Sequence, residues 1–306
     1  TFIAGVTMKV DDINFKFFHI NKWDNGEFKG DAISTTSELV KISSDGNLGL
    51  EEGQKFERGG IYRFTVDVTK GNTKAVLTVE KVGKVDLPAP DIFFGNDKME
   101  VTDTDIYKSD QAFTQGQMIT VTGIDNLNEW WIDPDFFEKQ SDGALKFLPI
   151  NGDYRVTANA VLKYFSVMAL KDGKPAKLQD DGTGAIWAIG KGIGKPSVTS
   201  SEVGWEPSKA LCLAQVASKK YQLTLKAGET LKTSGDPEVI SFKFFHQNDW
   251  GGEFGNYASS ILVEQLKLAD SGNLEMQDNK AFEEGAVYRF TIDVTNGNAN
   301  ACLLYT

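Results

Sequence analysis

The sequence predicts an all-β fold, built from tandem antiparallel β-sandwich modules. Apolar and polar side chains alternate over short runs, as in Tyr62–Val68, where the apolar residues occupy every second position. Turn residues recur densely between such runs, as in Ser44–Asn47 and Lys171–Gly173. No window carries a sustained helical stripe. Short alternating strands joined by such turns are typical of sandwiches of about 100 residues each.

One unit of sequence occurs twice. Ile13–His19 recurs as Ile240–His246, and Ile61–Thr69 recurs as Val287–Thr295, with similar spacing between the matches. Long matches with conserved spacing indicate an internal repeat. The repeated units are residues 13–82 and 240–306.

A fainter copy lies between these two units. Gly152–Thr157 is similar to the Tyr-Arg-Phe-Thr run of the repeat, and Pro88–Pro90 and Asp180–Gly182 read as boundaries. We therefore expect three modules, and the third is a repeat of the first. Their predicted ranges are 1–87, 88–182 and 183–306.

The first module is predicted to be incomplete at its N-terminus. Only 12 residues precede Ile13, whereas 57 residues separate Gly182 from Ile240 in the last module. A sandwich without its opening strands exposes edges and core. We expect the chain to be a fragment, so that upstream residues or another surface cover this edge.

The charge balance and residue counts exclude several classes of protein. The formal net charge is −11 and the isoelectric point is about 4.8, which argues against nucleic acid and anionic membrane surfaces as partners. No apolar run approaches the ~20 residues that span a bilayer. Two Cys and two His never cluster at ligand spacing, and neither a metal nor a cofactor is predicted.

Motifs that could carry catalysis have plainer interpretations. Gly190–Lys195 fits neither the dinucleotide nor the P-loop spacing, and we expect a mobile or glycan-facing loop. Asp133 and Asp135 lack the Gly and Glu of an EF-hand and are expected to be solvated acidic turns. His19 and His246 are duplicated with their core neighbours, which favours a structural role. No enzymatic activity is predicted.

Tryptophans in loops are the remaining candidates for a binding site. Trp23, Trp205 and Trp250 stand in segments rich in Gly, Asn, Asp or Pro. A flat ring in such a loop can stack on the apolar face of a pyranose while nearby polar groups bond its hydroxyls. The alternative is that these rings cap the sandwich core. Trp130 and Trp131 are adjacent, so one can be core while the other is exposed.

The segments around these tryptophans resemble a known family. Ala185–Ser197 leads to Gly204–Pro207, Ser241–His246 leads to Trp250–Phe254, and the middle stretch 120–134 fits as well. Over nearly its whole length the chain resembles the SusE/SusF-type glycan-binding surface lipoproteins of Bacteroidetes polysaccharide-utilisation systems.

The resemblance implies tandem immunoglobulin-like sandwiches on a lipid-anchored stalk at the extracellular face of the outer membrane. It implies non-catalytic capture of a polysaccharide, starch-like or another glycan, and a TonB-dependent porin and a SusD-type lipoprotein as partners. The family's signal peptide and lipid-bearing Cys do not occur in this sequence, as expected of a fragment. The alternative is a structural spacer or protein-interaction array in the same surface complex.

The resemblance also implies sites that pair a loop Trp with Lys or Arg and amide groups. Since the first module has no counterpart of Trp205 and Lys195, its site is expected to be half-built or inactive. The implied glycan-binding residues are Trp205, Trp250, Lys195 and Lys243 in the last module, Trp23, Lys16 and Asn25 in the first, and Trp130, Trp131 and Lys163 in the middle one.

Overall fold

The chain consists of two compact units. The computed structural model describes residues 1–5, 7–10, 12–21, 26–87, 90–103, 105–124, 126–233, 239–254 and 264–305. We call Thr1–Ala89 unit 1 and Pro90–Thr306 unit 2, and each is described by itself. The boundary between them falls within the predicted linker, whereas the predicted division of unit 2 at residue 182 stays a prediction.

Unit 1 contains a four-stranded sheet in the order β1-β5-β6-β2 and a hairpin of β3 and β4. Its pairs are antiparallel except β2 with β6, which is parallel. Its core gathers Val40, Phe56, Tyr62 and Leu77. The strands are β1 (Phe2–Ile3), β2 (Ile33–Thr35), β3 (Val40–Ile42), β4 (Leu48–Leu50), β5 (Gly60–Asp67) and β6 (Ala75–Lys84).

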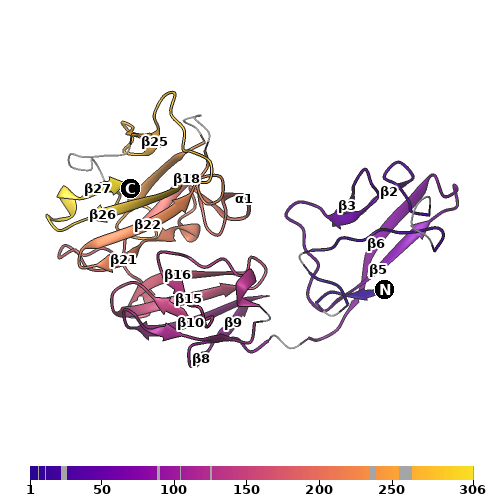
Figure 1. The fold of residues 1–306 in the computed structure, drawn as a ribbon, viewed down its shortest axis with the longest axis horizontal. Helices are drawn as coiled ribbons and strands as arrows, with labels where there is room; N and C mark the ends of the chain where they lie inside the picture. The colour runs from indigo at the N-terminus through magenta and orange to yellow at the C-terminus, as the bar shows by residue number, and fades with distance from the viewer. Residues whose placement is uncertain are drawn as a thin grey trace. The chain divides into compact units, whose positions relative to one another are not determined.

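The first part of unit 2 has a five-stranded sheet in the order β17-β16-β15-β10-β9, of which β16, β15, β10 and β9 lie side by side in Figure 1. Two smaller sheets have the orders β11-β14-β13 and β12-β7-β8. The elements are β7 (Phe93–Phe94), β8 (Asp97–Lys98), β9 (Glu100–Asp103), β10 (Ile106–Phe113), β11 (Met118–Ile119), β12 (Val121–Thr122), η1 (Leu127–Glu129), β13 (Phe137–Lys139), β14 (Leu145–Phe147), β15 (Gly152–Asn159), β16 (Tyr164–Lys171) and β17 (Lys174–Pro175).

The second part of unit 2 has two sheets, β19-β18-β23-β25-β24 with β20 also on β18, and β21-β22-β26-β27. Phe242 of one sheet meets Phe290 of the other edge-on, with ring centroids 5.8 Å apart. The elements are β18 (Trp187–Gly194), α1 (Val198–Ser201), β19 (Glu202–Gly204), η2 (Pro207–Lys209), β20 (Leu211–Cys212), β21 (Ala214–Ala217), β22 (Lys220–Lys226), β23 (Ser241–Phe245), β24 (Leu266–Leu268), β25 (Leu274–Met276), β26 (Val287–Asp293), η3 (Asn298–Asn300) and β27 (Cys302–Tyr305).

The predicted fold class is confirmed. Almost every regular element is a strand, and facing sheets enclose the apolar side chains, as in β-sandwiches. Tyr107, Phe113 and Phe165 belong to the core of the first part of unit 2, and Trp187 belongs to that of the second. Among the described residues, no helix has the length and hydrophobicity that a membrane crossing requires.

The two copies of the repeat form the same local structure. The Glu57 amide donates to Tyr62 Oη at 3.0 Å in unit 1, and the Glu283 amide donates to Tyr288 Oη at 2.8 Å in unit 2. The turns at Gly46 and Gly272 also match, since each Gly amide donates to the carbonyl three residues before it at 2.8 Å. The sequence repeat therefore reflects a repeat of structure.

The structure also extends the repeat upstream of Ile13. The Ala4 amide donates to Gly60 O at 3.0 Å, and the Ala227 amide donates to Ala286 O at 2.9 Å, at equivalent positions. Strand β1 pairs with β5 in the same register in which the end of β22 pairs with β26. β1 is therefore the counterpart of the last residues of β22.

The predicted loop at Gly190–Lys195 is wrong, because residues up to Gly194 belong to strand β18. This strand lies between β19 and β23 in its sheet and is buried at all positions except Lys191. A Cβ atom on Gly190 would come within 2.3 Å of Phe242 Cα. Glycine at this position allows two backbones to approach closely. In the sequence, a strand with such glycines looks like a glycine-rich loop.

Candidate binding site

Strand β18 brings the loops of Trp205 and Trp250 together. One edge of β18 pairs with β19, which ends at Gly204, directly before Trp205. The other edge pairs with β23, which ends at Phe245, and Trp250 lies in the turns that follow. Two segments far apart in sequence thus meet across one central strand.

The two indole rings form an aromatic pair. Their centroids are 6.3 Å apart and their planes are inclined by 27°. Trp205 is half-buried against the core, whereas Trp250 is 51% exposed. The buried ring of Phe245 meets Trp250 edge-on, with centroids 6.0 Å apart. We call Trp205 and Trp250 the aromatic pair. Its inner ring is anchored and its outer ring is accessible.

Side-chain hydrogen bonds order the turn that carries Trp250. Gln247 Nε2 donates to Trp250 O at 2.7 Å and to Gly251 O at 3.2 Å. The Trp250 amide donates to Asp249 Oδ1 at 2.8 Å. Gly251 and Gly252 both have positive φ, a backbone conformation that glycine adopts without strain. The position of the exposed ring is therefore set by its own loop.

Lys243, another predicted residue of this module, lies on β23, the strand that leads to Trp250. Strand alternation places Lys243 and Phe245 on the face opposite Phe242 and Phe244, and Phe245 is itself 1% exposed and part of the core. Lys243 Nζ donates to Ser271 O at 2.7 Å. Within the described part of the chain, the indole N–H of Trp250 has no hydrogen-bond partner. An exposed ring with a donor on its edge is suited to stacking and hydrogen bonding.

Lys195, which was predicted to stand beside Trp205 in a glycan site, lies elsewhere. Its side chain is buried, and Nζ donates to Asp133 Oδ1 and Oδ2 at 2.8 Å each and to Asp135 Oδ2 at 3.0 Å. The prediction for Lys195 does not hold, because the carboxylates already take up its hydrogen-bond donors. Asp133 and Asp135 are 2% and 1% exposed, so the expectation of solvated acidic turns is also wrong.

Asp135 accepts further hydrogen bonds from residues of strand β22. Gln222 Nε2 donates to its Oδ1 at 2.7 Å, and the Thr224 hydroxyl donates to the same oxygen at 2.6 Å. The Thr224 amide donates to Oδ2 at 2.6 Å. We call Lys195, Asp133, Asp135, Thr224 and Gln222 the buried ion network. It joins the two parts of unit 2.

The pKa values in this network reflect burial and pairing. Burial raises the pKa of Asp133, against the opposing effect of the Lys195 ammonium. Burial acts in the same direction on Asp135, but Lys195 and the donors of Thr224 and Gln222 outweigh it and lower its pKa. Burial disfavours the Lys195 ammonium, yet the two carboxylates raise its pKa above the ordinary value. The arrangement is a structural ion pair.

Of the three residues predicted for a site in the middle module, Trp131 and Lys163 lie side by side, since the Trp131 amide donates to Lys163 O at 2.7 Å. Trp130 is buried and stacks on Phe165, with centroids 4.4 Å apart, so it is a core residue. Trp131 is half-buried, and its Nε1 donates to Glu229 Oε1 at 2.8 Å. Lys163 Nζ donates to Glu129 Oε2 at 2.7 Å. Trp131 thus contributes to the junction between the two parts of unit 2.

In unit 1, Trp23 and Asn25 lie outside the described residues. Lys16 is half-buried, as is its repeat equivalent Lys243. His19 meets Phe28 edge-on at 5.4 Å and His246 meets Phe254 edge-on at 4.2 Å, and His19 is exposed whereas His246 is half-buried.

Sequence reasoning missed two residues of the candidate site. Gln247 holds the Trp250 turn and Phe245 supports the ring, but neither was singled out. Position offered a clue for Phe245, because it is the last residue of the Phe-rich strand that leads to Trp250. Among the described residues, no group of three or more His, Cys, Asp or Glu side chains is arranged to hold a metal ion.

The fold is that of a tandem β-sandwich protein, and its described residues include the aromatic pair, with the exposed ring of Trp250. The chain belongs to the family described as "Domain of unknown function (DUF5121)", whose model matches residues 1–69 and 181–295, more than half of the chain. Residues 85–178 match the model described as "Domain of unknown function (DUF5125)". No curated protein matches the chain.

Solved structures show distant similarity. SusF from Bacteroides thetaiotaomicron is 13% identical, with 99% of this chain and 74% of that chain covered and a TM-score of 0.26. The extracellular domain of protocadherin GammaB4 is 9% identical, with 89% and 58% covered and a TM-score of 0.16. Drosophila N-cadherin EC1-4 is 12% identical, with 88% of each chain covered and a TM-score of 0.13.

Proposed function

We propose that this chain binds a polysaccharide without catalysing a reaction on it, and that the aromatic pair is its binding site. The observation that carries the proposal is the exposed Trp250 ring, held beside the anchored Trp205 ring at 6.3 Å. The apolar face of a pyranose stacks on such a ring, while an indole N–H can donate to a sugar hydroxyl. A neutral glycan needs no basic surface, which is compatible with the net charge of −11.

The setting of this function is part of the proposal. The sequence resemblance supports a starch-like or other glycan as ligand and the extracellular face of the outer membrane as location. It also supports a lipid anchor, and a TonB-dependent porin and a SusD-type lipoprotein as partners. One shallow site buries little area and binds weakly, so retention of a polymer would depend on several contacts along it.

Affinity electrophoresis in gels that contain starch, xylan, mannan or pectin tests the proposal. We expect one polymer to retard the chain, and Trp250→Ala to weaken this retention by about tenfold, since an aromatic stacking contact is worth about 1.5 kcal/mol at most. Met118→Ala is the matched control, because Met118 is also 51% exposed but lies on β11. Retardation by none of the polymers would favour a spacer or protein-interaction role, whereas retention that survives Trp250→Ala would place the binding site away from the aromatic pair.

A further inference from the structure

The loop that carries Trp250 is closed by the backbone of His246. The His246 amide donates to Gly252 O at 2.7 Å, and a Cβ atom on Gly252 would lie 3.4 Å from His246 Cβ, so the two ends of the loop are packed together. We call residues 246–252 the Trp250 loop. The Leu178 amide donates to His246 O at 2.8 Å, which ties the same residue to a neighbouring segment. His246 therefore holds the base of the loop.

The imidazole of His246 lies in surroundings that suit its neutral form. The ring meets Phe254 edge-on, with centroids 4.2 Å apart. Its Nε2 atom is buried and has no hydrogen-bond partner among the described residues. A neutral imidazole keeps one nitrogen without a proton, whereas an imidazolium carries a charge and an N–H on both nitrogens. Protonation would therefore leave a buried, charged donor without an acceptor, which is costly.

The equivalent histidine of unit 1 has different surroundings. The His19 amide donates to Gly26 O at 2.8 Å, so the same backbone bond closes both loops. His19 is exposed, and its ring centroid lies 5.4 Å from that of Phe28. The two copies thus share the backbone of the loop, whereas the burial of the imidazole is particular to His246.

The carboxylate of Asp180 acts against the burial of this imidazole. Burial lowers the pKa of His246 below its ordinary value of 6.5, and the charge of Asp180, which favours protonation, does not cancel this effect. The other charged residues of segments 177–181 and 246–254 are exposed to solvent, which screens them: Lys177, Asp181, Asp249 and Glu253. The closed loop therefore favours the neutral imidazole.

This preference fixes the direction of the pH dependence. Because closure of the loop lowers the pKa of His246, an open loop takes up the proton first as the pH falls below about 6.5. The closed loop is thus fully favoured above about pH 6.5 and loses stability relative to the open loop as the pH falls further.

We propose that His246 makes the aromatic pair sensitive to acid: protonation of its imidazole opens the Trp250 loop, moves Trp250 away from Trp205 and releases a bound glycan. Trp205 stays in place, because it packs against the core and follows β19, on the other side of β18. Loss of the bond between His246 and Gly252 also loosens the turn that Gln247 orders. The last step, release of the glycan, rests on the proposed function.

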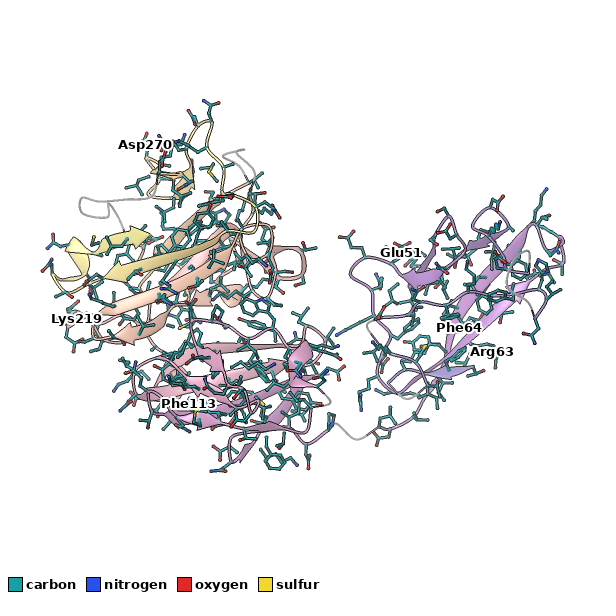
Figure 2. The ribbon with its side chains drawn as sticks, viewed as in Figure 1. Glu51, Arg63, Phe64, Phe113, Lys219 and Asp270 are labelled. Atoms are coloured by element: carbon teal, nitrogen blue, oxygen red, sulfur yellow. The ribbon has the colours of Figure 1, made fainter. Side chains whose placement is uncertain are left out.

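Amide hydrogen exchange of the full chain at several pH values tests the opening of the loop. We expect the protection factor of the His246 amide to fall about three- to tenfold between about pH 7.5 and about pH 5.5, since uptake of one proton shifts the equilibrium at most about tenfold per pH unit. The Gly272 amide should keep its protection, because it donates to Ala269 O in a separate turn, which also carries Asp270, labelled in Figure 2. An unchanged His246 amide, or an equal fall at Gly272, would overturn the proposal.

Substitutions assign the effect to the imidazole. His246→Phe and His246→Gln both remove the titrating group, and the fall in protection should disappear in each variant that keeps the loop closed at neutral pH. His19→Gln, at the exposed equivalent, should leave the fall unchanged. NMR titration of the unsubstituted chain needs no variant, and the His246 imidazole should titrate below 6.5. A midpoint at or above this value, or a fall that persists without the imidazole, would contradict the proposal.

Affinity electrophoresis tests the link to glycan binding. The polymer among starch, xylan, mannan and pectin that retards the chain at about pH 7.5 should retain it at least about threefold more weakly at about pH 5.5, whereas His246→Gln should be retained equally at both. If no polymer retards the chain at the higher pH, the proposed function fails, while hydrogen exchange still decides whether the loop opens. Constant retention by a polymer while the loop opens would overturn the proposed release.

Discussion

Lys195 donates hydrogen bonds to both carboxylate oxygens of Asp133, at 2.8 Å each, across 62 positions of sequence. The bond joins the residue that follows β18 to a segment of the neighbouring part of unit 2. Each charge is buried, so neither can return to water while the fold is intact. A buried pair of this kind makes the removal of one partner costly.

Lys195→Met should therefore lower the free energy of unfolding of unit 2 by about 3–5 kcal/mol, because two buried carboxylates lose their counter-charge. Chemical denaturation followed by tryptophan fluorescence measures the change. Lys191→Met is the matched control, since Lys191 is exposed on β18. Equal stability of both variants would show that the network contributes nothing to the fold.

Trp205→Ala and Trp250→Ala should differ in their effect on stability. Trp205 is half-buried against the core, and its removal should cost about 1–2 kcal/mol, below the range for a fully buried Trp. Trp250 is 51% exposed, and its removal should change stability by less than about 0.5 kcal/mol. Thermal unfolding of both variants checks this order, and a large loss for Trp250→Ala would make that ring a core residue.

Gly190→Ala should destabilise the second part of unit 2 by about 1–3 kcal/mol. The added Cβ would lie 2.3 Å from Phe242 Cα and 2.4 Å from Ser241 O, so β18 and β23 would have to separate. Urea denaturation gives the magnitude. Gly49→Ala serves as control, because its nearest neighbour would be Ile13 O at 3.9 Å. A neutral Gly190→Ala would mean that the two strands can part without loss.

The stability of unit 1 should fall in acid because of Glu57. Side-chain hydrogen bonds from Lys81 and Lys84 lower the pKa of Glu57 to about 2. The unfolded chain, with an ordinary value of 4.5, takes up the proton first as the pH falls. The contribution is thus complete above about pH 4.5 and is lost as the pH falls toward about 2.

Methyl NMR signals of Leu77 during urea titrations at several pH values measure this dependence. Glu57→Gln should flatten it, whereas Glu51→Gln, at an exposed residue of the same unit, should not. An unchanged pH dependence in Glu57→Gln would assign the acid sensitivity to other carboxylates.

The features that depend on residues close together in sequence could be predicted. The alternation in Tyr62–Val68 corresponds to strand β5, which ends at Asp67, and the repeat predicted equal turns at Tyr62 and Tyr288. The partner of Lys195 could not be predicted, because the contact depends on how two parts of the chain pack. Likewise the Gly190–Gly194 part of β18 was predicted to be a loop, since glycines that permit close approach of strands look the same in sequence as glycines in a loop.

The candidate site could also be predicted only in part. Loop composition indicated Trp205 and Trp250, and the structure brings both together. For Trp130 the composition could not separate a core ring from a binding ring, since the decision rests on Phe165, which lies on β16, 35 positions further along the chain.

The hydrogen bonds from Gln247 to the carbonyls of Trp250 and Gly251 have an entropic consequence. Fixing one backbone residue costs about 1–2 kcal/mol of conformational free energy. The conformational free energy of ordering this turn is already part of the free energy of folding. A molecule that stacks on Trp250 therefore binds a ring that is already held in place. The affinity of the ring for any ligand thereby depends on the Gln247 side chain, which donates to the backbone of the loop that carries the ring.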